Sequence, residues 1–434
     1  MKRKIMQDLL RWKNKSNRQP LILNGARQVG KTYILNKFAQ EQFSSVAYFN
    51  LENNLTARGF FEGNIDVQTI IQNLEVVLHE RISANSTLII LDEIQSCPRA
   101  LTALKEFSEN APQYYIVAAG SLLGVAINRE HYSFPVGKVD ELTLYPMDFE
   151  EFLWAMNEEQ LSILIRNHYT SNEKLVTALH ERALDFYRQY LIVGGMPAAV
   201  SQFSSTKSYI NVADIQQNVL NDYTADMAKY DTGSSAVKIR ACYHSIPAQL
   251  AKENKKFQYK VVQRGGSATI FGESIEWLKY AGVVLKCSKI TEGSIPVSAY
   301  VELSDFKLYM SDVGLLTLKS GMPSSMILST LHDDNTFLGA IAENYVAQAL
   351  VANGFQLFYW RSGNTAEVDF ILQFESQIAP LEVKKGLNTR SRSLNVYRER
   401  YKPQFVFRIS QKNFGFENGI KSVPLYAVYC IGKG

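Results

Sequence analysis

The fold of this 434-residue chain is decided by one stretch, Gly25-Ala26-Arg27-Gln28-Val29-Gly30-Lys31-Thr32. It fits the pattern Gly-x-x-x-x-Gly-Lys-Ser/Thr and lies between an apolar strand-like run at 21–24 and an amphipathic segment at 31–40, the context that this motif requires. Glycines let the backbone amides curl around a phosphate, and the following helix adds the positive end of its dipole. Lys31 is expected to reach the β and γ phosphates of ATP, and Thr32 to ligate Mg²⁺. The alternative is a chance glycine-rich turn.

A second signal is a run of four apolar residues at 88–91 that leads directly into Asp92 and Glu93. Such a run predicts a buried parallel strand, which delivers both carboxylates to the edge where open α/β sheets bind ligands. We expect Asp92 to hold the Mg²⁺ shell and Glu93 to orient or deprotonate the attacking water. Adjacent Asp and Glu residues are common, so the position after the strand carries the argument.

The next strand-like run, at 115–119, ends in Gly120 and Ser121, which places a small polar side chain at the same edge of the sheet. Ser121 is predicted to sense or position the nucleotide and water, the alternative being an ordinary turn serine. Asn50 ends the run at 45–50 and points to the same edge, but an asparagine that only terminates a strand is the simpler interpretation.

The organisation of the chain indicates several domains, because 434 residues exceed the size of one ordinary core. Residues 1–150 alternate apolar runs with amphipathic stretches, which predicts a parallel α/β sheet with helices on both faces. Residues 151–234 are helical in pattern, and 235–325 predict a small helical domain ending in a two-stranded wing. Residues 336–434 predict a smaller α/β domain. The expected elements are strands at 21–24, 45–50, 88–91, 115–119, 356–360, 367–373, 378–384 and 404–409, and helices at 31–40, 67–82, 100–110, 269–281 and 336–353.

Composition places the chain among folded proteins without a membrane span. Hydrophobic residues make up 46% and charged residues 20%, and the net charge of +4 does not by itself argue for nucleic acid. The four cysteines lie far apart and form no disulfide-like framework. The N-terminus lacks the apolar core of a signal peptide, and no run of about 18 apolar residues occurs, so we expect a cytoplasmic location and no membrane partner.

A second constellation lies near the C-terminus and consists of Glu343, Asp369, Glu382 and Lys384. Period-two geometry puts Glu382 and Lys384 on one face of a strand, and a hairpin would bring Asp369 beside Glu382. That arrangement predicts a Mg²⁺ site made by Asp369 and Glu382, with Lys384 near an attacking water and Glu343 above, suited to phosphodiester hydrolysis. The alternative is an edge strand with alternating charges.

Five residues of the same region supply cations and one aromatic ring for contact with DNA or RNA: Trp360, Arg361, Arg390, Arg392 and Arg398. Scattered surface arginines are the simpler explanation of this set.

The chain resembles prokaryotic AAA-type P-loop ATPases whose C-terminal half is a domain of unknown function. The N-terminal resemblance rests on Pro20-Leu21-Ile22-Leu23-Asn24 with the loop that follows, on Leu91-Asp92-Glu93-Ile94-Gln95, and on Pro146-Met147-Asp148-Phe149-Glu150-Glu151-Phe152. The C-terminal resemblance rests on Phe306-Lys307-Leu308-Tyr309, Asp312-Val313-Gly314-Leu315-Leu316, Glu343-Asn344 and Glu367-Val368-Asp369-Phe370.

The resemblance implies a helical lid-like region, a winged-helix-like domain and a C-terminal domain similar to the PD-(D/E)XK nuclease, or restriction-endonuclease-like, fold. All four nuclease-type positions are present, as Glu343, Asp369, Glu382 and Lys384. One departure concerns Gly137-Lys138, where the resemblance implies Gly-Arg, which argues against an arginine finger there. Arg129 and Lys138 are the nearest cations, and ordinary solvated side chains are the simpler interpretation of both.

Two functions follow from these patterns. The first is an ATP-driven switch or motor acting on DNA or RNA, with the terminal domain as a nuclease or clamp. The second is a nucleotide-gated protein that interacts with another protein, such as a defence or toxin-linked regulator, whose nuclease-like domain binds but does not cut. Neither the partner nor the oligomeric state can be derived from the residues.

Overall fold

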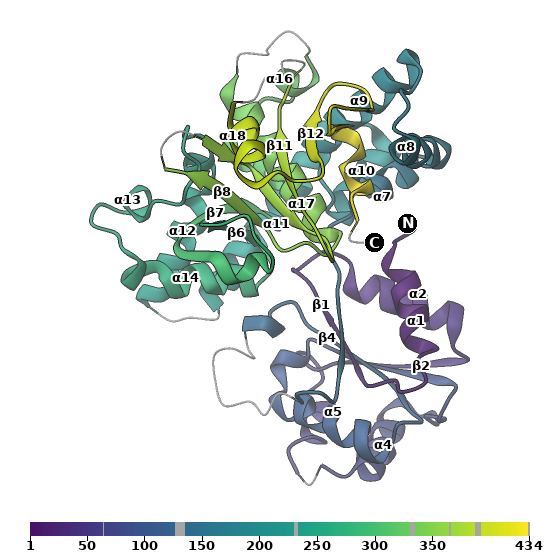
Figure 1. The fold of residues 1–434 in the computed structure, drawn as a ribbon. Coiled ribbons are helices and arrows are strands. Elements are labelled where there is room, and N and C mark those ends of the chain that lie inside the picture. The colour runs from purple at the N-terminus through teal and green to yellow at the C-terminus, as the bar shows by residue number, and fades with distance from the viewer. Residues whose placement is uncertain are drawn as a thin grey trace. The chain divides into compact units, whose positions relative to one another are not determined.

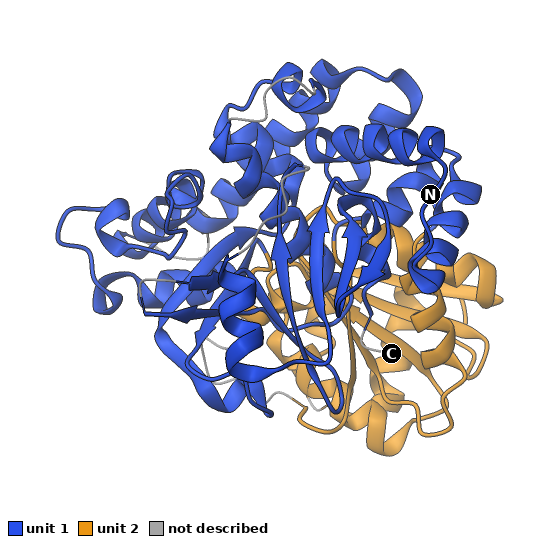
Figure 2. Ribbon diagram, turned by 45° about the horizontal axis from the view of Figure 1, so that its top comes forward, with its two compact units in different colours: residues 1–2, 146–279, 283–434 blue, residues 3–145, 280–282 orange. Residues whose placement is uncertain are grey.

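The computed structural model describes residues 1–63, 65–125, 135–229, 233–329, 335–363, 366–386 and 392–432 (Figure 1). The chain divides into two compact units, which Figure 2 distinguishes by colour. The N-terminal unit comprises Arg3–Tyr145 and Tyr280–Gly282, and the C-terminal unit comprises Met1–Lys2, Pro146–Lys279 and Val283–Gly434.

The N-terminal unit is built on a five-stranded sheet in the order β2-β3-β4-β1-β5, in which all the pairings are parallel. Its strands are β1 (Leu21–Asn24), β2 (Ser45–Asn50), β3 (Thr87–Asp92), β4 (Tyr115–Ala119) and β5 (Asp140–Thr143). Strand β4 therefore lies between β1 and β3, and the carboxyl ends of all three meet at one edge of the sheet. The predicted parallel sheet of the N-terminal region is confirmed.

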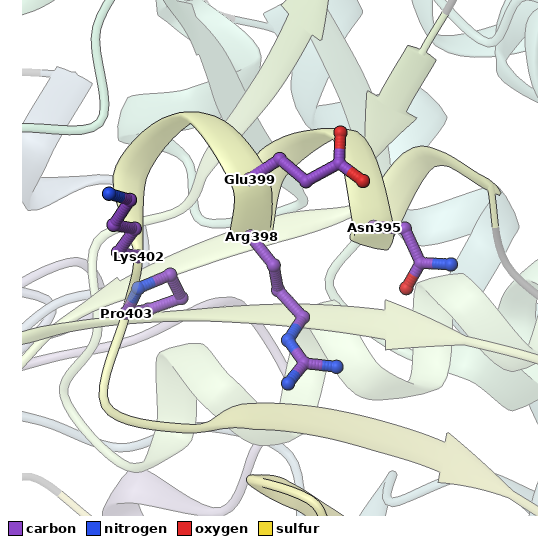
Figure 3. Close-up of a pocket in the computed structure, with 5 residues that line it drawn as sticks. All are labelled: Asn395, Arg398, Glu399, Lys402 and Pro403. Atoms are coloured by element: carbon purple, nitrogen blue, oxygen red, sulfur yellow. The ribbon is translucent and has the colours of Figure 1, made fainter.

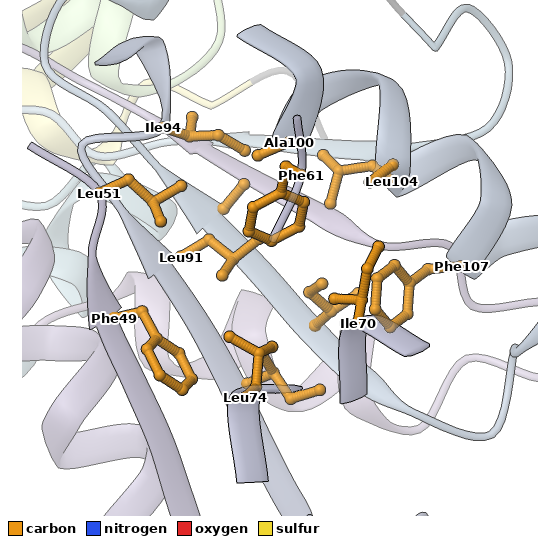
Figure 4. Close-up of a cluster of buried hydrophobic side chains, with 14 of the residues drawn as sticks. Phe49, Leu51, Phe61, Ile70, Leu74, Leu91, Ile94, Ala100, Leu104 and Phe107 are labelled. Carbon is orange, nitrogen blue, oxygen red and sulfur yellow. The ribbon is translucent and has the colours of Figure 1, made fainter. Parts of the chain in front are cut away.

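The core of this unit explains why its strands are continuous runs of apolar residues in the sequence. Every residue of β3 is buried, as expected for a parallel strand covered on both faces. Figure 4 shows part of the core on one side, where Phe49 and Leu91 of the sheet meet Ile70 and Leu74 of α4 (Val67–Leu78). Leu104 and Phe107 of α5 (Pro98–Asn110) join the same cluster.

The helix boundaries follow from local capping. The side chain of Asp66 accepts a hydrogen bond from the N–H of Thr69 at 2.8 Å, which begins α4, and Pro98 occupies the first turn of α5. The remaining elements of this unit are α1 (Ile5–Lys13), α2 (Lys31–Gln42), α3 (Leu55–Gly59) and the 3-10 turn η1 (Ile94–Ser96). Strand β5 and helices α1 and α3 were not predicted from the sequence.

Helices form the first half of the C-terminal unit, as the pattern predicted. The helices are α7 (Phe149–Ala155), α8 (Glu159–Ser171), α9 (Thr177–Val193), α10 (Pro197–Thr206), α11 (Tyr209–Lys229), α12 (Ser234–Leu250), α13 (Tyr259–Val262) and α14 (Ala268–Tyr280). The break between α9 and α10 falls at Gly194, because the proline at 197 starts a new helix.

A four-stranded sheet joins the middle of the sequence to its end. Strands β6 (Val284–Ile290) and β7 (Val301–Met310) pair antiparallel, and the 3-10 turn η2 (Val297–Tyr300) lies between them in the chain. Strand β6 also pairs in parallel with β8 (Phe358–Ser362), and β8 pairs with β9 (Ala366–Val368), giving the order β7-β6-β8-β9. The two strands expected as a wing are thus part of a sheet that also contains C-terminal strands.

The second sheet of this unit has the order β10-β11-β12-β14-β13. Its strands are β10 (Phe370–Gln373), β11 (Ile378–Val383), β12 (Val406–Ser410), β13 (Gly415–Glu417) and β14 (Ile420–Pro424). The run expected as one strand at 367–373 is divided at Asp369 between β9 of the first sheet and β10 of the second. Strands β10 and β11 form the expected antiparallel hairpin. The remaining elements are α15 (Val313–Ser320), α16 (Ser324–Leu328), α18 (Arg392–Tyr401) and the 3-10 turn η3 (Leu425–Cys430).

Helix α17 (Thr336–Ala352) differs from the prediction in its environment. The sequence pattern at 336–353 predicts an amphipathic helix with an exposed face, yet every residue from 340 to 350 is buried, because the helix packs against sheet strands, α9, α15 and η3. A helix that is buried all round needs internal partners for its polar residues. Of the helices in the described ranges, none combines the length and the apolar character needed to cross a membrane.

Candidate functional sites

The loop between β1 and α2 encloses the side chain of Lys31. The ammonium group of this largely buried residue donates hydrogen bonds to the carbonyl oxygens of Gly25 and Ala26, at 2.8 and 2.9 Å. Gly25 has a φ of +148°, and a Cβ atom there would lie 2.4 Å from the carbonyl oxygen of Leu144. The loop therefore needs glycine at 25. Gln28 and Gly30 have φ values of 66° and 94°, which turn the chain into the N-terminus of α2.

Asp92 is held at the edge of the sheet by several donors. Its Oδ2 accepts hydrogen bonds from the hydroxyls of Thr32 at 2.7 Å and Tyr48 at 2.8 Å, and its Oδ1 accepts from the N–H of Glu93 at 3.0 Å. Burial and the charge of Asp92 raise the pKa of the Tyr48 hydroxyl, so that tyrosine stays a neutral donor. The hydroxyl of Thr32 and the carboxylate of Asp92 are hard oxygen ligands side by side, and this donor set fits Mg²⁺.

Glu93 has a left-handed backbone conformation, with φ 51° and ψ 44°, directly after β3. This conformation is uncommon for a residue with a side chain and occurs often at functional positions. Its Oε2 accepts hydrogen bonds from the amide of Gln95 at 2.5 Å and from the hydroxyl of Ser121 at 3.5 Å. Ser121 thus lies beside Glu93 at the carboxyl edge of the sheet. Gln95 was not predicted as a site residue.

Two further residues of this unit, Arg3 and Asn50, bear on the predictions. Arg3 donates to the carbonyl oxygens of Val29 at 3.0 Å and Tyr145 at 2.6 Å, so it braces the loop from the N-terminal segment. Asn50 accepts the N–H groups of Glu52 and Asn53 and thereby caps the turn after β2, as its simpler interpretation predicted. Sequence reasoning missed Arg3 because a single basic residue near a terminus has no periodic signal.

Lys138 and Arg129 were the two cations considered in place of an arginine finger. Lys138 forms an ion pair with Glu109 at 2.9 Å, which supports the interpretation of an ordinary surface side chain. Arg129 lies outside the described residues.

The C-terminal constellation is brought together by α17, the β9–β10 junction and β11. Glu343 is buried and Asp369 is partly buried, and the Oδ2 of Asp369 accepts the N–H of Val383 at 2.8 Å. Glu382 forms an ion pair with Lys384 at 2.9 Å. Burial would lower the pKa of the Lys384 ammonium, but the carboxylates of Glu382, Asp369 and Glu343 raise it above its ordinary value.

Three side chains that were not predicted as site residues surround Glu343. Lys255, from the segment after α12, pairs with its Oε2. Its Oε1 accepts from the ammonium of Lys307 at 3.1 Å and from the hydroxyl of Tyr309 at 2.5 Å, both on β7. Burial alone would raise the pKa of the Glu343 carboxyl, but the two ammonium groups lower it to about 2. Sequence reasoning missed them because residues of β7 and of the segment after α12 give no sign in the sequence of a partner on α17.

The pKa of the Asp369 carboxyl is shifted upward, in the opposite direction to that of Glu343. Burial, followed by the charge of Glu343, raises its pKa to about 7. One oxygen of Glu382, Oε2, is buried without a hydrogen-bond partner, which would suit a cation. However, within the ranges that the structure describes, no group of three or more His, Cys, Asp or Glu side chains could hold a metal ion. The third carboxylate, Glu343, already has both oxygens paired with Lys255, Lys307 and Tyr309. The predicted Mg²⁺ pair of Asp369 and Glu382 stays a prediction.

Two of the residues predicted to contact a nucleic acid, Trp360 and Arg398, make contacts within the chain. Trp360 is fully buried and packs against Tyr397 and Tyr401, with ring centroids 5.2 and 5.8 Å away, so the prediction that it contacts a nucleic acid is wrong. Arg398 donates to the carbonyl oxygen of Asn418 at 2.8 Å. It also lines a hollow of about 450 Å³ along α18 (Figure 3), together with Asn395, Glu399, Lys402 and Pro403. Arg390 lies outside the described residues.

Comparison with known families agrees with this geometry in the N-terminal part. Residues 17–153 match the family described as AAA domain. Residues 184–326 and 338–428 match two families described as domains of unknown function, DUF8612 and DUF4143. The N-terminal region therefore has the fold of an AAA-type P-loop ATPase. No curated protein is significantly similar in sequence to this chain.

Several solved structures are similar to this chain at low identity. The Walker-type ATPase PABY2304 of Pyrococcus abyssi is 13% identical and has a TM-score of 0.45, with 73% of this chain and 95% of that chain covered. The ORC2 protein of Aeropyrum pernix, in its ADPNP-ADP complexes, is 13% identical with a TM-score of 0.36, covering 77% and 90%. A single-residue variant of RuvB from Thermotoga maritima is 13% identical with a TM-score of 0.31, covering 64% and 87%.

Proposed function

We propose that this chain binds ATP with Mg²⁺ in the loop between β1 and α2 and hydrolyses it. The observation that carries the proposal is the contact between Thr32 and Asp92 at 2.7 Å, next to the loop that encloses Lys31. A hydroxyl and a carboxylate at this distance, on the same edge of a parallel sheet, form the metal side of a nucleotide site. Bound Mg²⁺ would neutralise charge on the phosphates.

The remaining roles belong to the residues of the chain. Lys31 would exchange its carbonyl partners for the β and γ phosphates, because an ammonium group pairs more strongly with charged oxygens. Glu93 would orient or deprotonate the attacking water, and Gln95 and Ser121 would hold the Glu93 carboxylate in place. Asp92 and Thr32 would hold the metal.

Two substitutions test this assignment. Lys31→Ala should abolish tight nucleotide binding, since Lys31 contacts phosphates already in the ground state. Glu93→Gln should keep binding but slow hydrolysis by orders of magnitude, since Glu93 acts on water in the transition state. A binding isotherm with radiolabelled ATP and a steady-state phosphate assay separate the two effects. Lys105→Ala and Glu80→Gln, which alter exposed residues of the same unit, are the matched controls. Undiminished turnover in Glu93→Gln removes that residue from its role.

For the C-terminal unit we propose a role coupled to the nucleotide, with two candidates. Action on DNA or RNA by a PD-(D/E)XK nuclease-like region is favoured by the buried, unpartnered Oε2 of Glu382 and by the Glu382–Lys384 pair. A regulator of protein interactions, whose nuclease-like site does not cut, is favoured by the contacts of Lys255 and Lys307 with Glu343. A winged-helix-like middle and a cytoplasmic location stay predictions.

A further inference from the structure

The carboxylate of Glu343 has no oxygen left for a metal ion. Its Oε2 pairs with the ammonium of Lys255, and its Oε1 accepts from Lys307 at 3.1 Å and from Tyr309 at 2.5 Å. The carboxylate itself is 3% exposed, so these partners are enclosed with it. A buried carboxylate whose oxygens are both paired is satisfied without a cation from solution.

Lys307 is the centre of this arrangement. Lys307 is fully buried. Its ammonium contacts Glu367 at 2.7 Å in addition to Glu343, so this one lysine of β7 bridges α17 and β9. Burial would lower the pKa of Lys307, but the charges of Glu343, Glu367 and Asp369 raise it well above its ordinary value. The side chain is therefore a fixed positive charge among carboxylates.

The balance of charge around the site argues in the same direction. A divalent cation is attracted by carboxylate charge, and ammonium groups nearby offset most of that attraction. Here the acidic residues Glu343, Glu367, Asp369 and Glu382 face the lysines Lys255, Lys307 and Lys384. A divalent ion would have to enter against the ammonium groups of Lys255 and Lys307 beside Glu343 and of Lys384 beside Glu382.

We propose that the ammonium groups of Lys255 and Lys307 take the place of a divalent cation in this constellation. The cluster is then a metal-free ionic joint that fastens β7 and the segment after α12 to α17. This inference deepens the proposed role of the C-terminal unit, because it selects the candidate in which the nuclease-like site does not cut. It does not depend on ATP hydrolysis.

Binding of Mn²⁺ to the full-length chain, measured without nucleotide by the electron paramagnetic resonance signal of free Mn²⁺, tests the proposal. Asp92→Asn is the background, because it removes the metal ligand of the nucleotide site. In this background, adding Asp369→Asn should leave Mn²⁺ binding unchanged, because the C-terminal site holds no Mn²⁺. Addition of Lys255→Ala and Lys307→Met should create binding of about one equivalent, since the carboxylates lose their internal partners. Addition of Asp369→Asn should abolish the gained site.

Two results would overturn the proposal. One is Mn²⁺ binding in the Asp92→Asn background that disappears with Asp369→Asn, which would show that the lysines do not exclude the metal. The other is a folded chain with both lysines replaced that still binds none. If the Lys307→Met chain does not fold, Lys255→Ala alone supplies the test, because it frees Oε2 of Glu343 and should give weaker but measurable binding.

A double-mutant cycle on stability provides the second measurement. Glu343→Gln and Lys307→Met should each lower the unfolding temperature of the C-terminal unit, because each removes one partner of a buried charge. The chain with both changes should unfold at a higher temperature than the sum of the two losses predicts. Additive losses would contradict the joint. Nucleotide turnover is assayed separately on chains with Asp92 intact, so failure of the ATPase proposal is distinguishable.

Discussion

At the scale of single residues, the phosphate-binding loop depends on a position where no side chain fits. Gly25 combines a φ of +148° with a distance of 2.4 Å from its would-be Cβ to the carbonyl oxygen of Leu144. Gly25 and Leu144 directly follow the neighbouring strands β1 and β5, so neither residue can move far without disturbing the sheet. The shape of the loop and the pairing of the edge strand are therefore linked.

Gly25→Ala should weaken ATP binding by on the order of tenfold or more, equivalent to about 1.4 kcal/mol. The physical reason is that the added methyl group displaces the loop that surrounds Lys31. Gly59→Ala is the matched control, because a Cβ atom at Gly59 meets nothing within 4 Å. Calorimetric titration of both variants measures the difference. Equal affinities would show that β5 yields to the extra methyl group and that Gly25 is not required.

The residues of the ATP site show what a sequence can and cannot specify at this scale. The loop, Asp92 and Glu93 were predictable because short motifs and an apolar strand fix their positions along the chain. Tyr48 and Gln95 were not, because their roles depend on a hydrogen bond to a residue on another strand or on the direction of a turn. The lysines around Glu343 were missed for the same reason, since β7 and α17 lie far apart in the sequence.

At the scale of elements, α17 shows how a helix can be buried on every side. Asn344 accepts the N–H of Met310 at 2.8 Å and donates to the carbonyl oxygen of the same residue at 3.0 Å. Gln348 accepts the N–H of Val313 at 2.9 Å and donates to the hydroxyl of Tyr190 at 2.9 Å. These two amides replace the water that an exposed helix face would contact. Asn344 attaches α17 to the end of β7, and Gln348 attaches it to α15 and α9.

Asn344→Ala should destabilise the C-terminal unit by about 1–3 kcal/mol for each backbone group of Met310 that is left unpaired. The loss should appear in urea unfolding as a lower midpoint with an unchanged slope. Gly339→Ala on the same helix is the control, because nothing lies within 4 Å of its Cβ position, and alanine favours helix. A midpoint for Asn344→Ala equal to that of the control would show that Met310 finds other partners.

The elements that local patterns could predict were largely those found. Strands β1, β2 and β4 have the expected bounds, and α5, α14 and α17 were expected within two residues at each end. The division of 367–373 at Asp369 was not predictable, because adjacent strands of different sheets share one continuous apolar pattern. The pairing of β6 with β8 was missed because it joins segments about 70 residues apart, and no local periodicity reports such a contact.

At the scale of the whole molecule, the two proposed sites lie in separate units, so a substitution that removes one site should leave the chemistry of the other intact. Incubated with plasmid, linear duplex, single-stranded DNA or RNA, with Mg²⁺ or Mn²⁺ and with or without ATP, the chain should cut none of them while it hydrolyses ATP. Asp369→Ala should leave ATP hydrolysis nearly unchanged, because the residue belongs to the other unit. Gel analysis and phosphate release provide the two readouts.

Metal-dependent cutting that Asp369→Ala abolishes would contradict the ionic joint and restore the nuclease candidate. Binding to duplex DNA separates the remaining possibilities. If the C-terminal unit is a nucleic-acid clamp, its affinity should fall steeply as the salt concentration rises, because contacts with phosphates release counterions. No binding at low salt would favour the regulator of protein interactions.

The shared sheet β7-β6-β8-β9 has a consequence for synthesis of the chain on the ribosome. Strand β6 can pair with β7 as soon as both have emerged, but its other edge must wait for Phe358, Tyr359 and Trp360. Until those residues are translated, a row of backbone N–H and C=O groups stays open to other nascent chains. The interval between β6 and β8 is therefore when this protein is most exposed to misassembly, and a ribosome-associated chaperone would be most useful there.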